Sequence, residues 1–148
     1  MLRIRLTALA TALCIGAFAC TVDTPTAVSH RPHLQTTFLG GLICQLDNTV
    51  SGITDIRLQD IANEVCRAFN AGEITPEEAN SYFAKIAAAQ AALERGQVGV
   101  AVNVLNALVN ELQGQYVNKL CSPGDVRPVC ITLKKLIDDV QHLLGQLT

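Results

Sequence analysis

The chain has 148 residues, a formal net charge of −2 and 49% hydrophobic residues, of which few are aromatic. This length suits one domain with its own hydrophobic core. Eleven basic residues stand against thirteen acidic ones and form no basic patch, so nucleic acid is not an expected partner.

The first 19 residues have the layout of a secretory signal peptide. Arg3 and Arg5 form a basic start, residues 6–18 form an apolar run, and small residues stand at positions 17 and 19. The run is too short for a permanent membrane helix, which needs roughly 20 apolar residues. We therefore expect residues 1–19 to be removed and the protein to be exported, to the cell envelope or to the extracellular space.

Cys20 would be the first residue of the mature protein. The sequence Ala-Phe-Ala-Cys resembles a bacterial lipoprotein box, in which the cysteine is acylated, although Phe18 stands where that box usually has a small residue. Ordinary cleavage before Cys20 is the alternative. Residues 20–37 are rich in Thr, Ser and Pro, so we expect them to form a tether between a lipid at Cys20 and a domain at 38–148.

Four cysteines remain for that domain: Cys44, Cys66, Cys121 and Cys130. An even number in an exported chain predicts two disulfides, for which three connectivities exist. We favour Cys44 with Cys66 and Cys121 with Cys130, because the second pair brackets a Pro-Gly turn signal. The spacings contain no C-x-x-C pair, so a zinc site is not expected.

Along the domain, apolar residues recur at intervals of three and four residues. This spacing predicts helices almost throughout and little strand. The first expected helix covers 54–70 and ends at Ala71-Gly72. The second begins with Thr75 as N-cap, Pro76 at the first helical position and Glu78 at N3, which is a capping box, and ends at Arg95-Gly96. The expected core residues of these helices are Leu58, Ile61, Ala62, Val65, Phe69, Ala79, Tyr82, Phe83, Ile86 and Leu93.

A third helix is expected from Val98 to about Asn118, and a fourth from about Arg127. The connection between the second and third is so short that they must form an antiparallel hairpin. The sequence therefore predicts an all-α fold, a small antiparallel bundle of about four helices stapled by two disulfides. The expected core residues of the last two helices are Val98, Ala101, Leu105, Leu108, Val109, Leu112, Tyr116, Val129, Leu133, Leu136, Ile137, Val140 and Leu144.

Residues 73–115 resemble the FIMAH-type helical module found at the ends of large exported bacterial proteins, and the likeness extends more loosely to residue 147. The matching features are the Ile-Thr-Pro start, a line through Lys85, Ala89, Ala92, Leu93 and Arg95-Gly96, and the Leu-Asn-Ala-x-x-Asn-Glu signature at 105–111. The resemblance implies a secreted, helical, non-catalytic accessory domain and carries over no catalytic residues.

Few residues suggest chemistry. His30 and His33 lie in the expected tether, His142 should face solvent, and adjacent acidic pairs at 77–78 and 138–139 point about 100° apart on their helices. Known catalytic and nucleotide-binding motifs do not occur, so we expect no enzyme activity, no catalytic residue, no metal and no cofactor.

Asn103, Asn106 and Asn110 cluster along one flank of the third helix and form a possible contact surface for a protein or glycan partner, or else only a solvated stripe. The leading hypothesis is a non-catalytic exported protein that binds another macromolecule. The alternative is a saposin-like carrier of a lipid or small apolar ligand. A Cys44–Cys130 disulfide would favour the carrier and Cys121–Cys130 the compact module.

Overall fold

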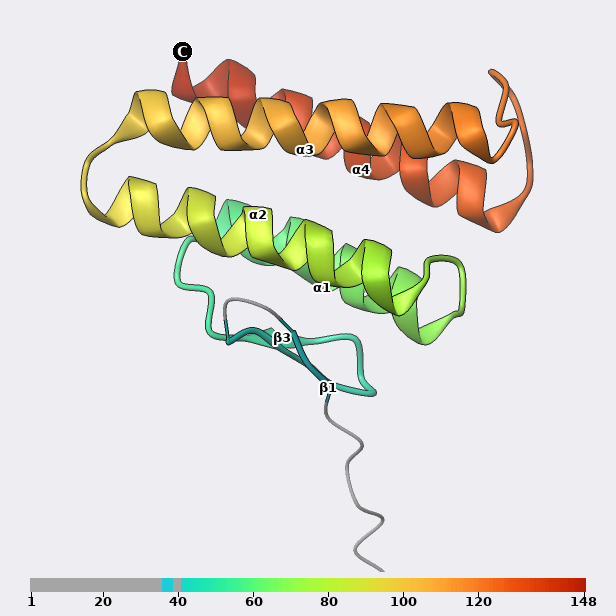
Figure 1. The fold of residues 1–148 in the computed structure, drawn as a ribbon, viewed down its shortest axis with the longest axis horizontal. Helices are drawn as coiled ribbons and strands as arrows, with labels where there is room; N and C mark the ends of the chain where they lie inside the picture. Colours follow the sequence, from blue (N-terminus) through green and yellow to red (C-terminus); the bar gives the residue numbers. More distant parts are fainter. Residues whose placement is uncertain (1–35, 39–40) are drawn as a thin grey trace, which may run out of the picture. The chain divides into compact units, whose positions relative to one another are not determined.

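The computed structural model describes residues 36–38 and 41–148, which belong to one compact unit. The expected leader and all but the last two residues of the expected tether, with Cys20, His30 and His33, lie outside the described residues. Four helices follow a small sheet (Figure 1). They are α1 (Ile56–Asn70), α2 (Pro76–Glu94), α3 (Val98–Asn118) and α4 (Pro128–Leu147).

The helices form an antiparallel bundle in which α1 packs against α2 and α4, and α3 packs against the same two helices (Figure 1). Local signals place their ends. The Thr75 hydroxyl accepts from the Glu78 backbone N–H at 3.2 Å, and the Glu78 carboxylate accepts from the Thr75 N–H at 2.7 Å, as expected for a capping box. Gly72 and Gly96 follow α1 and α2 with φ of 70° and 69°, values that favour glycine.

One helix boundary and two core residues differ from expectation. The first helix begins at Ile56 and not at 54, because Asp55 is its N-cap and accepts from the Arg57 backbone N–H at 2.9 Å. Val98 was expected in the core, but as the first residue of α3 it is 40% exposed. On α4 the residue buried near the end is Leu143, seven positions after Leu136, rather than Leu144.

The described chain is mostly helical with little strand, as expected, but short strands between residues 36 and 51 form a small sheet that the sequence pattern did not locate. The strands β1 (Thr36–Thr37), β2 (Ile43–Cys44) and β3 (Val50–Ser51) form an antiparallel sheet in the order β1-β2-β3. β1 is the end of the expected tether. Each strand has two residues, too few to produce an alternating apolar pattern that sequence reasoning can detect.

An aromatic cluster attaches this sheet to the bundle. The ring centroid of Phe38 lies 4.6 Å from that of Phe83 on α2 and 5.2 Å from that of Phe69 on α1. Phe38 and Phe83 are buried in the same hydrophobic core as the helices. Gln90 adds a polar link between the sheet region and the bundle. Its side chain, on α2, accepts from the backbone N–H of Thr54, in the loop before α1, at 3.1 Å.

Candidate contact surfaces

The structure contains both expected disulfides. Cys44 is bonded to Cys66 and Cys121 to Cys130, with Cα atoms 5.5 Å apart in each pair. Two disulfides indicate a non-cytoplasmic, oxidising location. The connectivity differs from the Cys44–Cys130 bond that would have favoured the saposin-like carrier.

The loop between α3 and α4, together with the first turn of α4, exposes three aliphatic side chains that are close in sequence to the Cys121–Cys130 disulfide. Leu120 is 82% exposed, Val126 is 83% exposed and Ile131 is 55% exposed. We call these three residues the aliphatic loop site. Buried aliphatic side chains stabilise a fold, so a group of them held in solvent marks a surface that can bind an apolar partner.

Leu120 has an unusual backbone conformation for its type. Its φ is 54°, in the left-handed region that glycine adopts at the end of a helix and that costs a branched side chain roughly 1 kcal/mol or more. Its backbone N–H donates to the Val117 carbonyl at 2.9 Å, which closes the end of α3. The protein thus tolerates local strain where glycine would be easier, and the result is an exposed leucine.

Several polar contacts hold the loop in place. The Arg127 guanidinium donates to the Leu120 carbonyl at 2.7 Å and to both carboxylate oxygens of Asp125. The Tyr116 hydroxyl donates to the Ser122 carbonyl at 2.8 Å. Together with the disulfide, these contacts hold the aliphatic loop site in one conformation before any partner binds, which lowers the entropic cost of binding.

The Asp125 carboxylate should titrate well below an ordinary aspartate. Hydrogen bonds from the Arg127 side chain lower the pKa of Asp125 from 3.8 to about 2. Because the folded pKa lies below the unfolded one, this pair contributes stability above pH 3.8 that is lost as the pH falls through about 2. We expect a carboxyl NMR titration to give a midpoint near 2 and R127Q to raise it toward 3.8. A wild-type midpoint near 3.8 would show that Arg127 does not hold the Asp125 carboxylate in solution.

The predicted Asn surface lies on the outward side of α3. Asn103, Asn106 and Asn110 are all exposed, as expected. Glu111 is the only charged residue of α3, a helix described over its whole length, and it forms an ion pair with Lys85 of α2 at 2.6 Å. The outward face of α3 therefore carries uncharged polar residues together with the exposed Val100 and Val117, and a lack of charge is a feature of interface centres.

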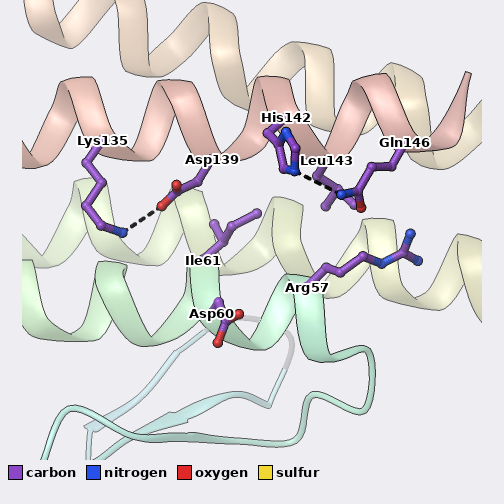
Figure 2. A pocket seen from close by; sticks show the side chains of 8 residues that line it. All are labelled: Arg57, Asp60, Ile61, Lys135, Asp139, His142, Leu143 and Gln146. Carbon is purple, nitrogen blue, oxygen red and sulfur yellow. Dashed lines mark hydrogen bonds and ion pairs between the residues drawn. The ribbon is translucent and has the colours of Figure 1, made fainter.

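A shallow groove lies between α1 and α4 (Figure 2). Ile61 and Leu143 lie between polar residues from both helices, and His142 is exposed and contacts Gln146 at 2.9 Å. Lys135 pairs with Asp139 at 2.7 Å, and that hydrogen bond raises the pKa of Lys135. The groove is lined by Arg57, Asp60, Ile61, Lys135, Asp139, His142, Leu143 and Gln146.

The groove's charges are largely matched within the protein. Besides the Lys135–Asp139 pair, Arg57 donates to the Asp55 carboxylate at 2.7 Å, and the hydrogen bond from Arg57 lowers the pKa of Asp55. A site whose cations and anions already pair with one another attracts neither anionic nor cationic ligands strongly. Asp138 likewise pairs with Lys134 at 2.7 Å. The acidic pair at 138–139 therefore consists of two ion-paired surface residues.

A second polar network joins α1 to α4 away from the groove. Arg67 donates to Glu64 at 2.8 Å, to Glu73 at 3.3 Å and to the hydroxyl of Thr132, which is buried. Hydrogen bonding to Glu64 raises the pKa of Arg67. Every member has a partner, so the network fixes the packing of two helices and has no free group for ligand binding.

Within the described residues no group of three or more His, Cys, Asp or Glu side chains could hold a metal ion. None of the helices in that part of the chain is both long and apolar enough to cross a membrane. The described residues offer two candidate contact surfaces: the aliphatic loop site and the outward face of α3.

Comparison of the chain with family models, with curated proteins and with solved structures found no match. The resemblance to the FIMAH-type module therefore stays a prediction from the motifs at 73–115. Function has to be argued from the surfaces of this protein.

Sequence reasoning missed the aliphatic loop site. The signal was present, because Leu120 and Val126 flank the Pro-Gly turn, in a loop that has no helical face to direct them into the core. Apolar residues in such a loop can also fold back onto the domain. Only the structure shows that the disulfide and Arg127 hold them outward.

Proposed function

We propose that this protein is a non-catalytic exported module that binds another protein at the cell envelope, tethered by a lipid at Cys20. The observation that carries the proposal is the aliphatic loop site, in which Leu120 and Val126 are each more than four-fifths exposed. Exposed apolar side chains next to ordered polar groups mark surfaces at which proteins bind partners. The motifs shared with the FIMAH-type module, a non-catalytic accessory domain, support the same class of function.

The charges around the loop favour a protein as the partner. Arg127 is paired with Asp125, and Lys134 is paired with Asp138, both at 2.7 Å. Paired cations add little attraction for an anionic surface such as a nucleic acid or an acidic membrane. The exposed aliphatic side chains fit a complementary apolar pocket, and the ordered loop presents them without further folding.

The test is a substitution that keeps the backbone and removes the apolar side chain. Asparagine tolerates the left-handed conformation better than other polar residues, so L120N should leave stability unchanged within about 0.5 kcal/mol. The matched control is L46N, which changes an exposed leucine in the turn between β2 and β3. A photo-crosslinking residue at Val126 in the full chain then reports what the loop touches in native envelopes.

We expect one discrete crosslinked protein from Val126, lost with L120N and retained with L46N. Losing a buried leucine from an interface costs roughly 1–3 kcal/mol, or about ten-fold or more in affinity. Crosslinks to lipid alone, or a crosslink that L120N leaves at full yield, would contradict a protein partner at this site.

A further inference from the structure

Four residues on the outward face of α3 form a symmetric pattern; Asn106 and the 67% exposed Val117 lie on the same face but do not belong to the pattern. Gly99, Asn103, Asn110 and Gly114 follow one line along the helix at successive spacings of four, seven and four residues, and all four are exposed. At 100° per residue they fall within an arc of about 60°. The same order of glycine, asparagine, asparagine and glycine appears when the helix is read in either direction.

We propose that this face binds a second copy of the same chain, with the two α3 helices antiparallel. A two-fold axis between Asn106 and Ala107 places Asn103 opposite Asn110 of the second copy. The same axis places Gly99 opposite Gly114, so that both ends of the contact lack side chains and the helices can approach closely. In a two-fold dimer each such contact occurs twice.

The chemistry of the face suits an identical partner. An asparagine amide has both donors and an acceptor, so two asparagines can bond to each other, which two like charges cannot. The chain carries a net charge of −2, and two copies repel each other unless they meet where charge is absent. The α3 face meets this condition, because Glu111, the only charge on this helix, is paired with Lys85 at 2.6 Å.

The size of the surface is compatible with a weak specific dimer. The symmetric line from Gly99 to Gly114 is about 23 Å long, and with the alanine-rich neighbour α2 the layer is about 20 Å wide, so about 450 Å² is available per copy. Stable specific interfaces begin near about 1,200 Å² in total. We therefore expect a dimer that forms at high local concentration, as on a membrane surface if Cys20 is acylated.

Cysteine crosslinking tests the geometry directly. The chain carries C14S and C20S, so that the introduced thiol is the only one outside the two disulfides. Crosslinking is carried out at about 1 mM, because without Cys20 no lipid can raise the local concentration. A mixture of N103C and N110C should form a covalent dimer, at about ten times the yield of either variant alone. In an antiparallel pair the two Asn103 positions are more than about 10 Å apart, beyond the reach of a disulfide, which needs Cα atoms within about 7 Å.

Other outcomes overturn the proposal. If the N103C variant and the N110C variant each formed a disulfide-linked dimer on its own, the two helices would be parallel. The control is Q141C, at an exposed position on α4; a crosslinking yield no greater than that of Q141C would indicate random collision. Sedimentation gives a second measurement: N106K places two like charges beside the axis and should weaken association at least ten-fold. A wild-type protein that sediments as a monomer at about 1 mM would also contradict the dimer.

This result is separable from that of the proposed function. L120N, which lies outside the symmetric line, should not change association of the two copies. N106K, which lies outside the aliphatic loop site, should not change crosslinking from Val126. A protein that dimerises but gives no Val126 crosslink would therefore reject the proposed function alone, and a protein that gives the crosslink but stays monomeric would reject the dimer alone.

Discussion

Reduction of both disulfides is expected to lower the melting temperature by about 20 °C while leaving the helical circular dichroism signal largely intact below the transition. The 22-residue separation of Cys44 and Cys66 corresponds to about 3 kcal/mol of stabilisation, and the 9-residue separation of Cys121 and Cys130 to about 2.5 kcal/mol. For a domain of this size each kcal/mol shifts the transition by about 4 °C. The helices persist because their apolar faces stay buried in one core.

Single-pair variants separate the two contributions. C44A/C66A should be the less stable, because it releases the longer loop and removes two buried side chains; alanine avoids leaving a hydroxyl in the core. C121A/C130A should lose less stability but should free the aliphatic loop site. A reduced protein with the spectrum of a random coil would show that the helical core is not stably folded without its disulfides.

Replacing Phe83 by alanine is expected to destabilise the protein by about 3–5 kcal/mol, the range for a fully buried aromatic residue. Such a loss is a large part of the roughly 5–15 kcal/mol by which domains are stable. Denaturant unfolding measures it. The Phe83 ring lies 4.6 Å from that of Phe38. Amide hydrogen exchange at β2 should therefore be faster in F83A than in the wild-type protein under native conditions.

Ile56 provides the control for that experiment. It is 70% exposed in the first turn of α1, so I56A should change stability by less than about 0.5 kcal/mol. If F83A lowered stability but left exchange at β2 unchanged, the aromatic cluster would not be what holds the sheet. A loss below about 1 kcal/mol would place Phe83 outside the core altogether.

Much of the bundle could be predicted because its signals are local. The capping box at Thr75 and Glu78 and the glycines after α1 and α2 act within one turn of each helix end, so neighbours in the sequence are enough to identify them. The disulfide pairing could also be predicted, since each bond joins cysteines that are next to each other in order. The structure confirms these features.

The sheet could not be predicted in the same way. Its strands are two residues long, and Phe38 is buried by Phe69 and Phe83, which lie 31 and 45 positions further along the chain. The polar network around Arg67 has the same character, because it depends on Thr132 from α4. Contacts of this kind exist only after the helices have packed.

The sequence by itself indicated four helices and most of their ends, favoured the observed cysteine pairing over two alternatives, and determined that α3 carries asparagines in place of charges. The tertiary structure decided which apolar residues are left over for contact. Leu105 and Leu120 both belong to the α3 region, yet one is fully buried and the other largely exposed. The difference arises because α2 and α4 cover the first, whereas the second lies past the end of the helix, where Arg127 and a disulfide hold the backbone away from the core.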